Sequence, residues 1–481
     1  MIHSKPLLIL TSVTLVAFGC TDDPSQSQSP DGTVAPVDAS IDSEALADAG
    51  DLPDVQALDS AMDAAPPPRP GRDVFDTPDC SGEHPPLILI HGMLEAGDAW
   101  SAHIRRFVAN GHCAGRYYAF DWDPINRDVD FVPVLSALVN EVLATHGTDQ
   151  VDLAAHSAGA GLAYGYANDP ANAAKIRRYV HAGTFAPDAS PGPDDAPITM
   201  LNLWSAGDTV AEGENVDVEG VTNVRLETED HYSVITSGGS FSAIYSFLYG
   251  EQPSTIIPLE SDAPWIGGRA VSLGENLPAV DSRLTVWQVD GATGRRLEIH
   301  AEETLGEDGW WGPVVADPNH YYEMMVDITQ PSVPDVRYFR PPFAGDDGFV
   351  YLRTFPSPGS LASVLLSQIP VTDNHVSLVI FNAKSSFLNG RDSLTLDGRE
   401  LINEEVASAE DTAIALFVFD IDRDGAEGGQ SALFEMFPFL SAVDLPIEPV
   451  ANESIVLDFN GRKLRIPRDP ASQGVLVAVF D

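Results

Sequence analysis

A serine between small residues follows a short apolar run in this chain, in the sequence V-D-L-A-A-H-S-A-G-A-G at 151–161. A serine hydroxyl becomes a good nucleophile when an imidazole takes its proton and a carboxylate fixes the tautomer of that imidazole. The sequence predicts a buried strand, a tight turn that carries Ser157, and a helix behind it. Small residues at Ala155 and Gly159 suit the close approach of the strand and helix backbones, so Ser157 is the candidate nucleophile.

The acid and base that Ser157 would need follow later in the chain. His231 lies just after the last predicted strand of this region, and Asp208 just after the strand before it. The order Ser, Asp, His is the order expected when such a triad is built on an α/β sheet. Three other aspartates remain as rival acids in less favoured places or too near His231 in sequence: Asp217, Asp188 and Asp230.

The oxyanion of a tetrahedral intermediate needs backbone N–H donors. Ala158 follows the candidate nucleophile, and Met93 follows His91-Gly92, where the glycine lets the backbone turn. We expect the N–H groups of Met93 and Ala158 to form the oxyanion hole. His91 and His156 flank these turns, and for both we expect a structural role.

The elements that must position these residues alternate between strand and helix. Leu87 to Ile90 is a continuous apolar run, which is typical of a strand buried on both faces. Further strands are expected at 116–122, 151–156, 179–185, 199–204 and 221–227, and helices at 98–110, 131–146, 158–168 and 233–249. This pattern predicts an α/β fold with a mostly parallel sheet, whose strand carboxyl ends share one edge. Each candidate catalytic residue falls at that edge.

The segment from 87 to 231 resembles secreted bacterial triacylglycerol lipases and esterases of the α/β-hydrolase superfamily. The matching motifs are HGM at 91–93, AHSAG at 155–159, SAGDTV at 205–210 and DH at 230–231. The resemblance implies a Ser157-Asp208-His231 triad, the oxyanion donors named above, a lipid or other acyl-ester substrate, an acyl-enzyme intermediate and no metal or cofactor. The segment 186–198 is short and rich in Pro and Asp, so we expect no large lid there.

Beyond the hydrolase segment the pattern becomes all-β. Alternating strands and turns predict a transthyretin-like β-sandwich at 253–340, a similarity centred on 282–326, and a second β domain at 341–481. Taken whole, the chain resembles a group of prokaryotic lipases with a C-terminal β-barrel-type domain. In that group the added domain helps to accommodate long acyl chains, so a role in substrate binding is the expectation here.

Two local features of the β region could bind a ligand. The pairs Trp310-Trp311 and Tyr321-Tyr322 lie in predicted strands, where aromatic side chains usually form the core. The run 420–425 (DIDRDG) matches the start of a calcium loop, but its twelfth position is Ser431 where a bidentate Glu belongs. An acidic hairpin turn is therefore favoured over a calcium site.

The N-terminus has the features of an export signal. Residues 1–20 combine Lys5, a short apolar segment and Cys20 after a small residue, which resembles a bacterial lipoprotein signal with Cys20 as the lipidated residue. Residues 21–72 are acidic and rich in Pro and Ala, which predicts a disordered tether ahead of a catalytic domain at 73–252. The expected location is the outer membrane or cell surface, by a lipid anchor, or otherwise the medium.

Composition and cysteines set further limits. Lys and Arg number 26 and Asp and Glu 72, and the net charge of −46 argues against nucleic acid as a partner. With Cys20 used by the signal, Cys80 and Cys113 form an even pair that favours a disulfide in an exported protein. The oligomeric state is open. Alternatives to a lipase or esterase are a phospholipase, a polyester hydrolase, an acyltransferase, or a non-catalytic surface-binding protein.

Overall fold

The computed structural model describes residues 84–481 apart from 127, 212–215, 331, 409–411, 432–433 and 435–438. The predicted signal at 1–20, Cys20, the tether at 21–72 and Cys80 lie outside the described residues, and those expectations stay predictions. Among the residues that are described, no helix combines the length and the apolar character that crossing a membrane requires.

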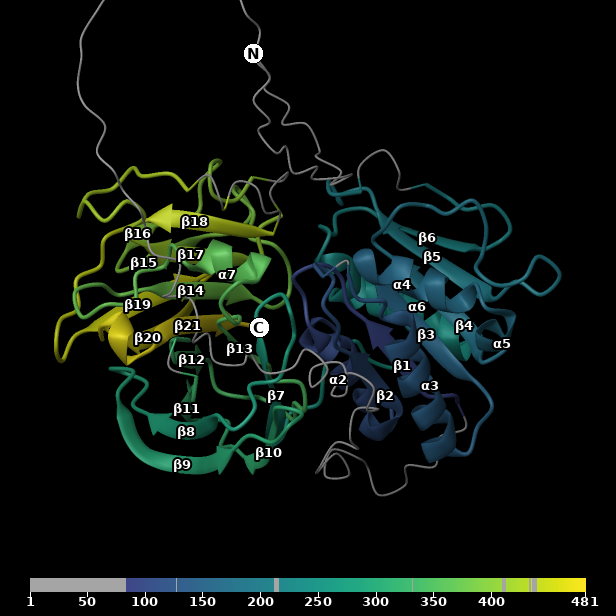
Figure 1. The fold of residues 1–481 in the computed structure, drawn as a ribbon, viewed down its shortest axis with the longest axis horizontal. Helices are drawn as coiled ribbons and strands as arrows, with labels where there is room; N and C mark the ends of the chain where they lie inside the picture. Colours follow the sequence, from purple (N-terminus) through teal and green to yellow (C-terminus); the bar gives the residue numbers. More distant parts are fainter. Residues whose placement is uncertain are drawn as a thin grey trace, which may run out of the picture. The chain divides into compact units, whose positions relative to one another are not determined.

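A six-stranded parallel sheet forms the centre of the first region (Figure 1). Its strands lie in the order β2-β1-β3-β4-β5-β6. Their bounds are β1 Leu87–Ile90, β2 Tyr117–Phe120, β3 Val151–His156, β4 Ile176–Ala182, β5 Thr199–Ser205 and β6 Thr222–Leu226. The strand order reverses beside β1 and β3, and in open α/β sheets ligands bind outside the strand carboxyl ends at such a switch point.

Helices cover both faces of this sheet because alternate residues of its buried strands point to opposite sides. Leu87 and Leu89 of β1 pack in a core with Phe107 of α2 and Phe241 of α6. On the other face Ile88 and Ile90 pack with residues of α3 and α4. The helical elements are η2 Gly97–Trp100, α2 Ser101–Ala109, η3 Ala114–Arg116, α3 Val132–His146, α4 Ala158–Ala167, α5 Pro170–Ala173, η4 Ser233–Ile235 and α6 Gly238–Tyr249.

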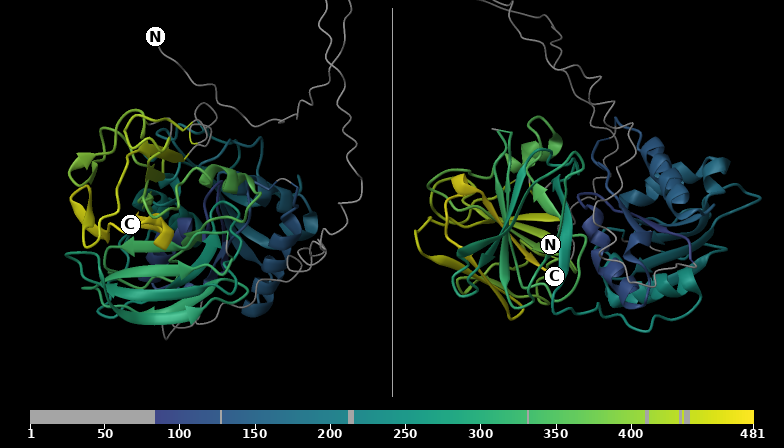
Figure 2. Two further views of the ribbon diagram at one scale, coloured as in Figure 1. Left: turned by 60° about the vertical axis from the view of Figure 1, so that its left-hand side comes forward. Right: turned by 90° about the horizontal axis from the view of Figure 1, so that it is seen from below.

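The region from residue 265 onward is built of β-sheets, shown in green and yellow in Figure 2. An eight-stranded sheet has the order β18-β17-β14-β21-β12-β11-β8-β9, and two smaller sheets have the orders β10-β7-β13 and β16-β15-β19-β20. The bounds are β7 Trp265–Ser272, β8 Arg283–Val289, β9 Arg296–Thr304, β10 Trp310–Val315, β11 Tyr321–Asp327, β12 Val336–Arg340, β13 Leu352–Thr354, α7 Leu361–Leu366, β14 Leu378–Asn382, β15 Leu394–Leu396, β16 Arg399–Glu400, β17 Ala415–Phe419, β18 Leu440–Asp444, β19 Ser454–Phe459, β20 Arg462–Pro467, η6 Ala471–Gln473 and β21 Val475–Phe480. The predicted fold class, α/β followed by all-β, is confirmed.

The boundary expected at residue 340 does not separate two independent sheets. Strand β12 pairs in parallel with β21, so the eight-stranded sheet joins strands from both sides of that boundary. Strands β7 and β13 pair across it as well. A second core fills the space between the eight-stranded and the four-stranded sheet, with side chains such as Leu416, Ile455 and Leu476.

The hydrophobic core continues from the α/β region into the β region. One cluster of buried side chains contains Phe107 and Phe241 from helices and Tyr338 and Val477 from the eight-stranded sheet. The expectation that paired aromatics belong to the core is confirmed for Trp311 and Tyr322, which are buried, whereas Trp310 and Tyr321 are partly exposed. Separating the two regions would expose apolar surface from both.

Candidate active site

Ser157 occupies the turn between β3 and α4 with φ 49° and ψ −121°. This backbone conformation is sparsely populated by residues other than glycine, so the surrounding structure must hold it in place. The Ser157 N–H donates to the Ala182 carbonyl at 3.1 Å, which ties the turn to β4. At Gly159 a Cβ would lie 2.6 Å from the His91 carbonyl oxygen, so only glycine fits there. The predicted strand, turn and helix are all present.

The structure brings Ser157, His231 and Asp208 into one hydrogen-bonded chain. The Ser157 Oγ lies 2.9 Å from His231 Nε2, and His231 Nδ1 lies 2.9 and 3.1 Å from the two carboxylate oxygens of Asp208. Asp208 and His231 are buried, and Ser157 is partly exposed. Ser157 follows β3, Asp208 follows β5 and His231 follows β6, as the sequence pattern predicts. An ionised Asp208 fixes the His231 proton on Nδ1 and leaves Nε2 free to accept the serine proton.

The protonation of this pair is set by burial and by mutual charge. Burial alone would raise the pKa of Asp208, but the charge and hydrogen bond of His231 outweigh it and lower the pKa. Backbone N–H groups of Val210 and Ala211 also donate to the Asp208 carboxylate. For His231 burial acts to lower the pKa, and the Asp208 charge and hydrogen bond raise it on balance. Asp208 is therefore ionised near neutral pH, and its charge and hydrogen bond stabilise the protonated form of His231.

The three rival aspartates have other positions. The Asp217 carboxylate accepts a hydrogen bond from the Trp204 indole, and Asp188 is exposed. Asp230 uses one carboxylate oxygen to accept from the backbone N–H groups of Tyr232 and Ser233. Of the four candidate acids, Asp208 is the one that contacts the His231 ring.

The turn after β1 passes directly beside the serine. A Cβ on Gly92 would lie 2.9 Å from the Ser157 Cβ, so the glycine is required by this close approach. No hydrogen bond joins the N–H groups of Met93 or Ala158 to another described residue. The unengaged N–H of Met93 lies in the turn beside the serine and that of Ala158 directly after it, and backbone donors of this kind are what an oxyanion hole requires.

A buried acid-histidine pair lies behind the nucleophile. His156 Nδ1 lies 2.9 Å from Glu95 Oε1, and His156 Nε2 lies 2.9 Å from the His231 carbonyl oxygen. The Gly92 N–H donates to Glu95 Oε2 at 2.7 Å. Because both partners of His156 are acceptors, both bonds form together only when each ring nitrogen carries a proton. The pair connects the turn at Gly92 to the backbone of His231.

Burial alone would raise the pKa of Glu95, but the charge and the hydrogen bond of His156, together with the Gly92 N–H, lower it. His91 differs, because burial lowers its pKa and both the Trp122 N–H and the Asn276 amide donate toward its Nε2 at 3.3 Å. Neither His91 nor His156 contacts Ser157 by a hydrogen bond, so both take backbone-supporting positions.

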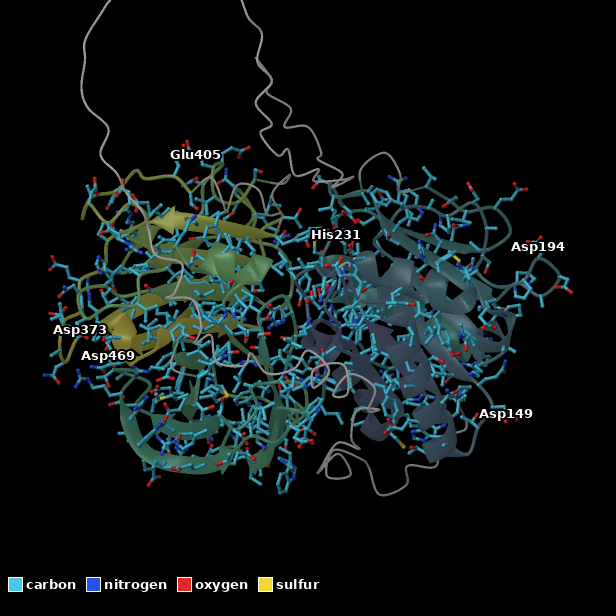
Figure 3. The ribbon with its side chains drawn as sticks, in the orientation of Figure 1. Asp149, Asp194, His231, Asp373, Glu405 and Asp469 are labelled. Carbon is cyan, nitrogen blue, oxygen red and sulfur yellow. The ribbon has the colours of Figure 1, made fainter. Side chains whose placement is uncertain are left out.

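The β region contacts the site at three points. The Phe439 ring, just before β18, stacks on the His231 ring with centroids 5.4 Å apart and planes 12° apart. The Arg391 guanidinium and the Ser386 N–H donate to Asp230 Oδ2, next to His231. The Asn276 amide donates to the Glu95 and Trp122 carbonyls. Figure 3 labels His231 among the surrounding side chains.

Partly buried charge pairs also link the two regions. The Arg353 guanidinium of β13 forms a bidentate salt bridge with the Asp98 carboxylate, with N–O distances of 2.7 and 2.6 Å. Arg269 of β7 and the Tyr351 hydroxyl both donate to Asp121, which follows β2. Bidentate pairs between arginine and carboxylate fix the orientation of the two groups as well as their distance. These contacts hold the α/β edge near the site against β7 and β13.

Sequence reasoning missed several of these residues. Glu95 carried one signal, since a charged residue in the apolar turn H-G-M-L-E-A-G is unusual. The others, Asn276, Arg391 and Phe439, meet the site across more than forty residues of chain and have no local signature. The predicted Cys80–Cys113 bridge stays a prediction, because Cys113 is buried but Cys80 lies outside the described residues.

Three segments of the chain match family models. Residues 84–166 match the model described as lipase (class 2), and residues 264–356 match the lipase C-terminal domain. A third model, described as a C-terminal domain, matches residues 365–472. The first segment contains the turn at 91–93 and Ser157, and the second contains β7, β13 and the arginines that pair with Asp121 and Asp98.

Solved structures similar to this chain include several α/β hydrolases. A serine hydrolase without a lid from Xanthomonas campestris is 17% identical over 38% of this chain and 88% of its own, with a TM-score of 0.28. A lipase from Bacillus licheniformis is 15% identical over 36% of this chain and 95% of its own, with a TM-score of 0.29. A carboxylesterase from Bacillus subtilis is 15% identical over 36% and 86%, with a TM-score of 0.26.

Proposed function

We propose that this chain is a serine carboxylic-ester hydrolase acting on lipid or other acyl esters, in keeping with its matches to the class 2 lipase and lipase C-terminal domain models. The observation that carries the proposal is the hydrogen-bonded chain from Ser157 through His231 to Asp208. It lies beside two backbone N–H groups that no described residue engages.

In the first half-reaction the Ser157 oxygen attacks the ester carbonyl carbon while His231 Nε2 takes the hydroxyl proton. The carbonyl π electrons move to the oxygen, and the N–H groups of Met93 and Ala158 stabilise the resulting oxyanion. Collapse of this intermediate breaks the bond to the alcohol oxygen, which receives the proton from His231. The products are the free alcohol and an ester between the acyl group and Ser157.

In the second half-reaction a water molecule gives its proton to His231 Nε2 and attacks the acyl carbon. The same N–H groups hold the second oxyanion, and collapse returns the proton to the Ser157 oxygen as the carboxylic acid leaves. Asp208 keeps its charge throughout and stabilises the His231 imidazolium that forms in each half-reaction.

Two features support an open site that admits an acyl chain. Ser157 is partly exposed, and the segment 183–198 contains turns and bends without a helix or strand that could serve as a large lid. The Phe439 ring against His231 places an apolar surface from the β region at the edge of the site. We infer that the β region contributes part of the acyl-binding wall.

The test is hydrolysis of p-nitrophenyl esters of increasing acyl length by the full chain, by Ser157→Ala and by Ser367→Ala. Ser367 is exposed at the end of α7 and serves as the matched control. We expect Ser157→Ala to lose activity and labelling by a fluorophosphonate probe, while Ser367→Ala keeps both. Ester hydrolysis that survives Ser157→Ala would contradict the assignment of the nucleophile. An intact protein that hydrolyses no ester would favour a surface-binding role.

Export as a lipid-anchored protein is a separate part of the proposal and rests on the sequence of residues 1–20. Metabolic labelling with a fatty acid, compared between the native chain and Cys20→Ser, measures it. Label on the native chain that disappears in Cys20→Ser is expected, and equal labelling of the two would contradict the anchor.

A further inference from the structure

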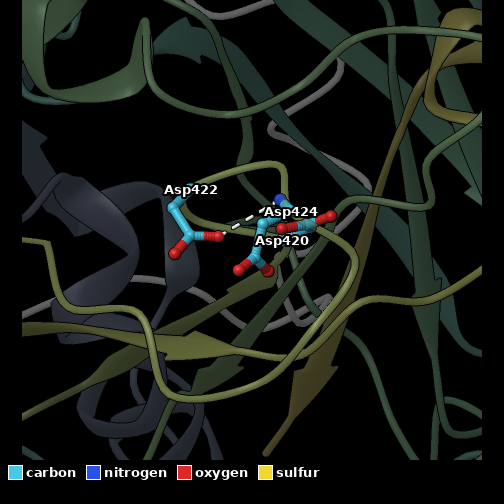
Figure 4. A group of neighbouring side chains, drawn as sticks. All are labelled: Asp420, Asp422 and Asp424. Atoms are coloured by element: carbon cyan, nitrogen blue, oxygen red, sulfur yellow. Dashed lines mark hydrogen bonds between the residues drawn. The ribbon is translucent and has the colours of Figure 1, made fainter.

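A cluster of carboxylates lies outside the candidate active site, in the turn that follows β17 (Figure 4). Asp420, Asp422 and Asp424 each offer a carboxylate oxygen, and these three oxygens lie within 4.8 Å of one another. The sequence D-I-D-R-D-G places acidic residues at every second position of the turn. The cluster by itself indicates an acidic turn and is not evidence of a metal site.

Asp420 supplies a second and independent observation. Its side chain is 4% exposed, yet its Oδ1 is buried without a hydrogen-bond partner among the described residues. The other oxygen, Oδ2, accepts from the Gly425 N–H at 3.1 Å and lies 3.8 Å from His375 Nε2. A buried carboxylate oxygen without a donor carries an uncompensated desolvation penalty. A bound cation would remove that penalty.

The neighbouring charges also favour a cation. Asp444 of β18 is held nearby because its carboxylate accepts from the Ile421 and Gly429 N–H groups. Four carboxylates gathered at one turn outnumber its single arginine, Arg423, and a bound cation would relieve their mutual repulsion.

We propose that Asp420, Asp422 and Asp424 bind a calcium ion. Oxygen ligands from carboxylates and backbone suit calcium, which accepts irregular geometry, better than magnesium, which requires a near-ideal octahedron. The twelfth loop position is Ser431, whose hydroxyl donates to the Gln368 side chain at 2.6 Å and offers one oxygen, so it cannot act as the bidentate ligand that a Glu would be. Without a bidentate Glu we expect a weak site, with a Kd of about 10⁻⁴–10⁻³ M.

The experiment is calorimetric titration of the metal-stripped full chain with Ca²⁺, together with the thermal midpoint measured with and without the ion. Asp422 and Asp424 are exposed, so the double variant Asp422→Asn/Asp424→Asn should fold. Glu405→Gln removes one exposed charge elsewhere in the β region and is the matched control (Figure 3). We expect one ion per chain for wild type and Glu405→Gln, and at least about tenfold weaker binding for the double variant.

Three outcomes would overturn the proposal. The first is no saturable binding of Ca²⁺ by wild type at millimolar concentrations. The second is equal binding by the double variant, and the third is an equal rise of the midpoint with Mg²⁺ at the same ionic strength, which would indicate charge screening. The readouts require no ester hydrolysis, so their failure is distinguishable from failure of the proposed function.

Discussion

The two loops that carry Ser157 and His231 are supported in different ways. The serine turn is held mainly by its own region, because Gly92, Glu95, His156 and Ala182 all belong to the α/β sheet and its loops. From the β region, the Asn276 amide reaches the Glu95 backbone carbonyl. The His231 loop is held from both regions. The His156 ring bonds the His231 carbonyl from within the α/β region. Phe439, which stacks on the His231 ring, and Arg391, which pairs with Asp230, come from the β region.

This difference indicates which part of the candidate active site the β region helps to position. The proposed nucleophile and oxyanion donors should depend less on the β region than the position of the proposed base, His231, does. The hydrophobic core runs from α2 and α6 into the eight-stranded sheet, so deleting the β region tests folding more than catalysis. Single substitutions at contacts to the His231 loop, one in the α/β region and one in the β region, separate effects on folding from effects on catalysis.

The largest effect is expected for Asp208→Asn, which removes the carboxylate that bonds the His231 ring. We expect kcat/KM to fall by about 10⁴, because an amide no longer fixes the His231 tautomer. Since Asp208 holds the pKa of His231 above 6.5, wild-type kcat/KM rises as pH increases through that raised value. The rise moves to lower pH in the variant. Asp217→Asn is the control, and a similar loss there would contradict the choice of acid.

A smaller effect is expected for Glu95→Gln, which weakens the support within the α/β region. Glu95 is 5% exposed, and loss of its charged hydrogen bonds should destabilise the fold by about 2 kcal/mol, measured by urea unfolding. The folded-state pKa of Glu95 is depressed, so its contribution is present above the unfolded value of 4.5 and is lost as pH falls through the folded value.

Wild type and Glu95→Gln should therefore converge in stability at acid pH. Asp149→Asn, in the exposed loop after α3, provides the matched control (Figure 3). A constant difference between wild type and Glu95→Gln at every pH would show that shape, not charge, is what Glu95 supplies.

The smallest effect is expected for Arg391→Ala, which removes the polar support from the β region. The Arg391–Asp230 pair is partly exposed, so its loss should raise the activation free energy by about 1 kcal/mol at most. That corresponds to a fall in kcat of up to roughly fivefold, with KM little changed. Arg283→Gln removes a comparable surface pair on β8 and should leave kcat unchanged. An unchanged kcat in Arg391→Ala would mean that the α/β region alone positions His231.

Much of the fold could be predicted from local patterns. The buried run Leu87 to Ile90, the small residues around Ser157 and the alternation of strand and helix specify a parallel sheet with loops at one edge. The same rule placed Asp208 and His231, because strand carboxyl ends in such a sheet share an edge. The division of the β region at residue 340 was less predictable, because β12 pairs with β21, the last strand of the chain.

The sequence by itself determined the residue types of the chemistry and their order, since hydrophobic period and turn residues are local properties of the chain. Only the tertiary structure decided which acid meets His231 and that Glu95 and His156 form a pair. It also decided that Phe439 covers the imidazole and that one oxygen of Asp420 is buried without a partner. Such contacts depend on the packing of distant segments, and no local pattern records which segments will meet.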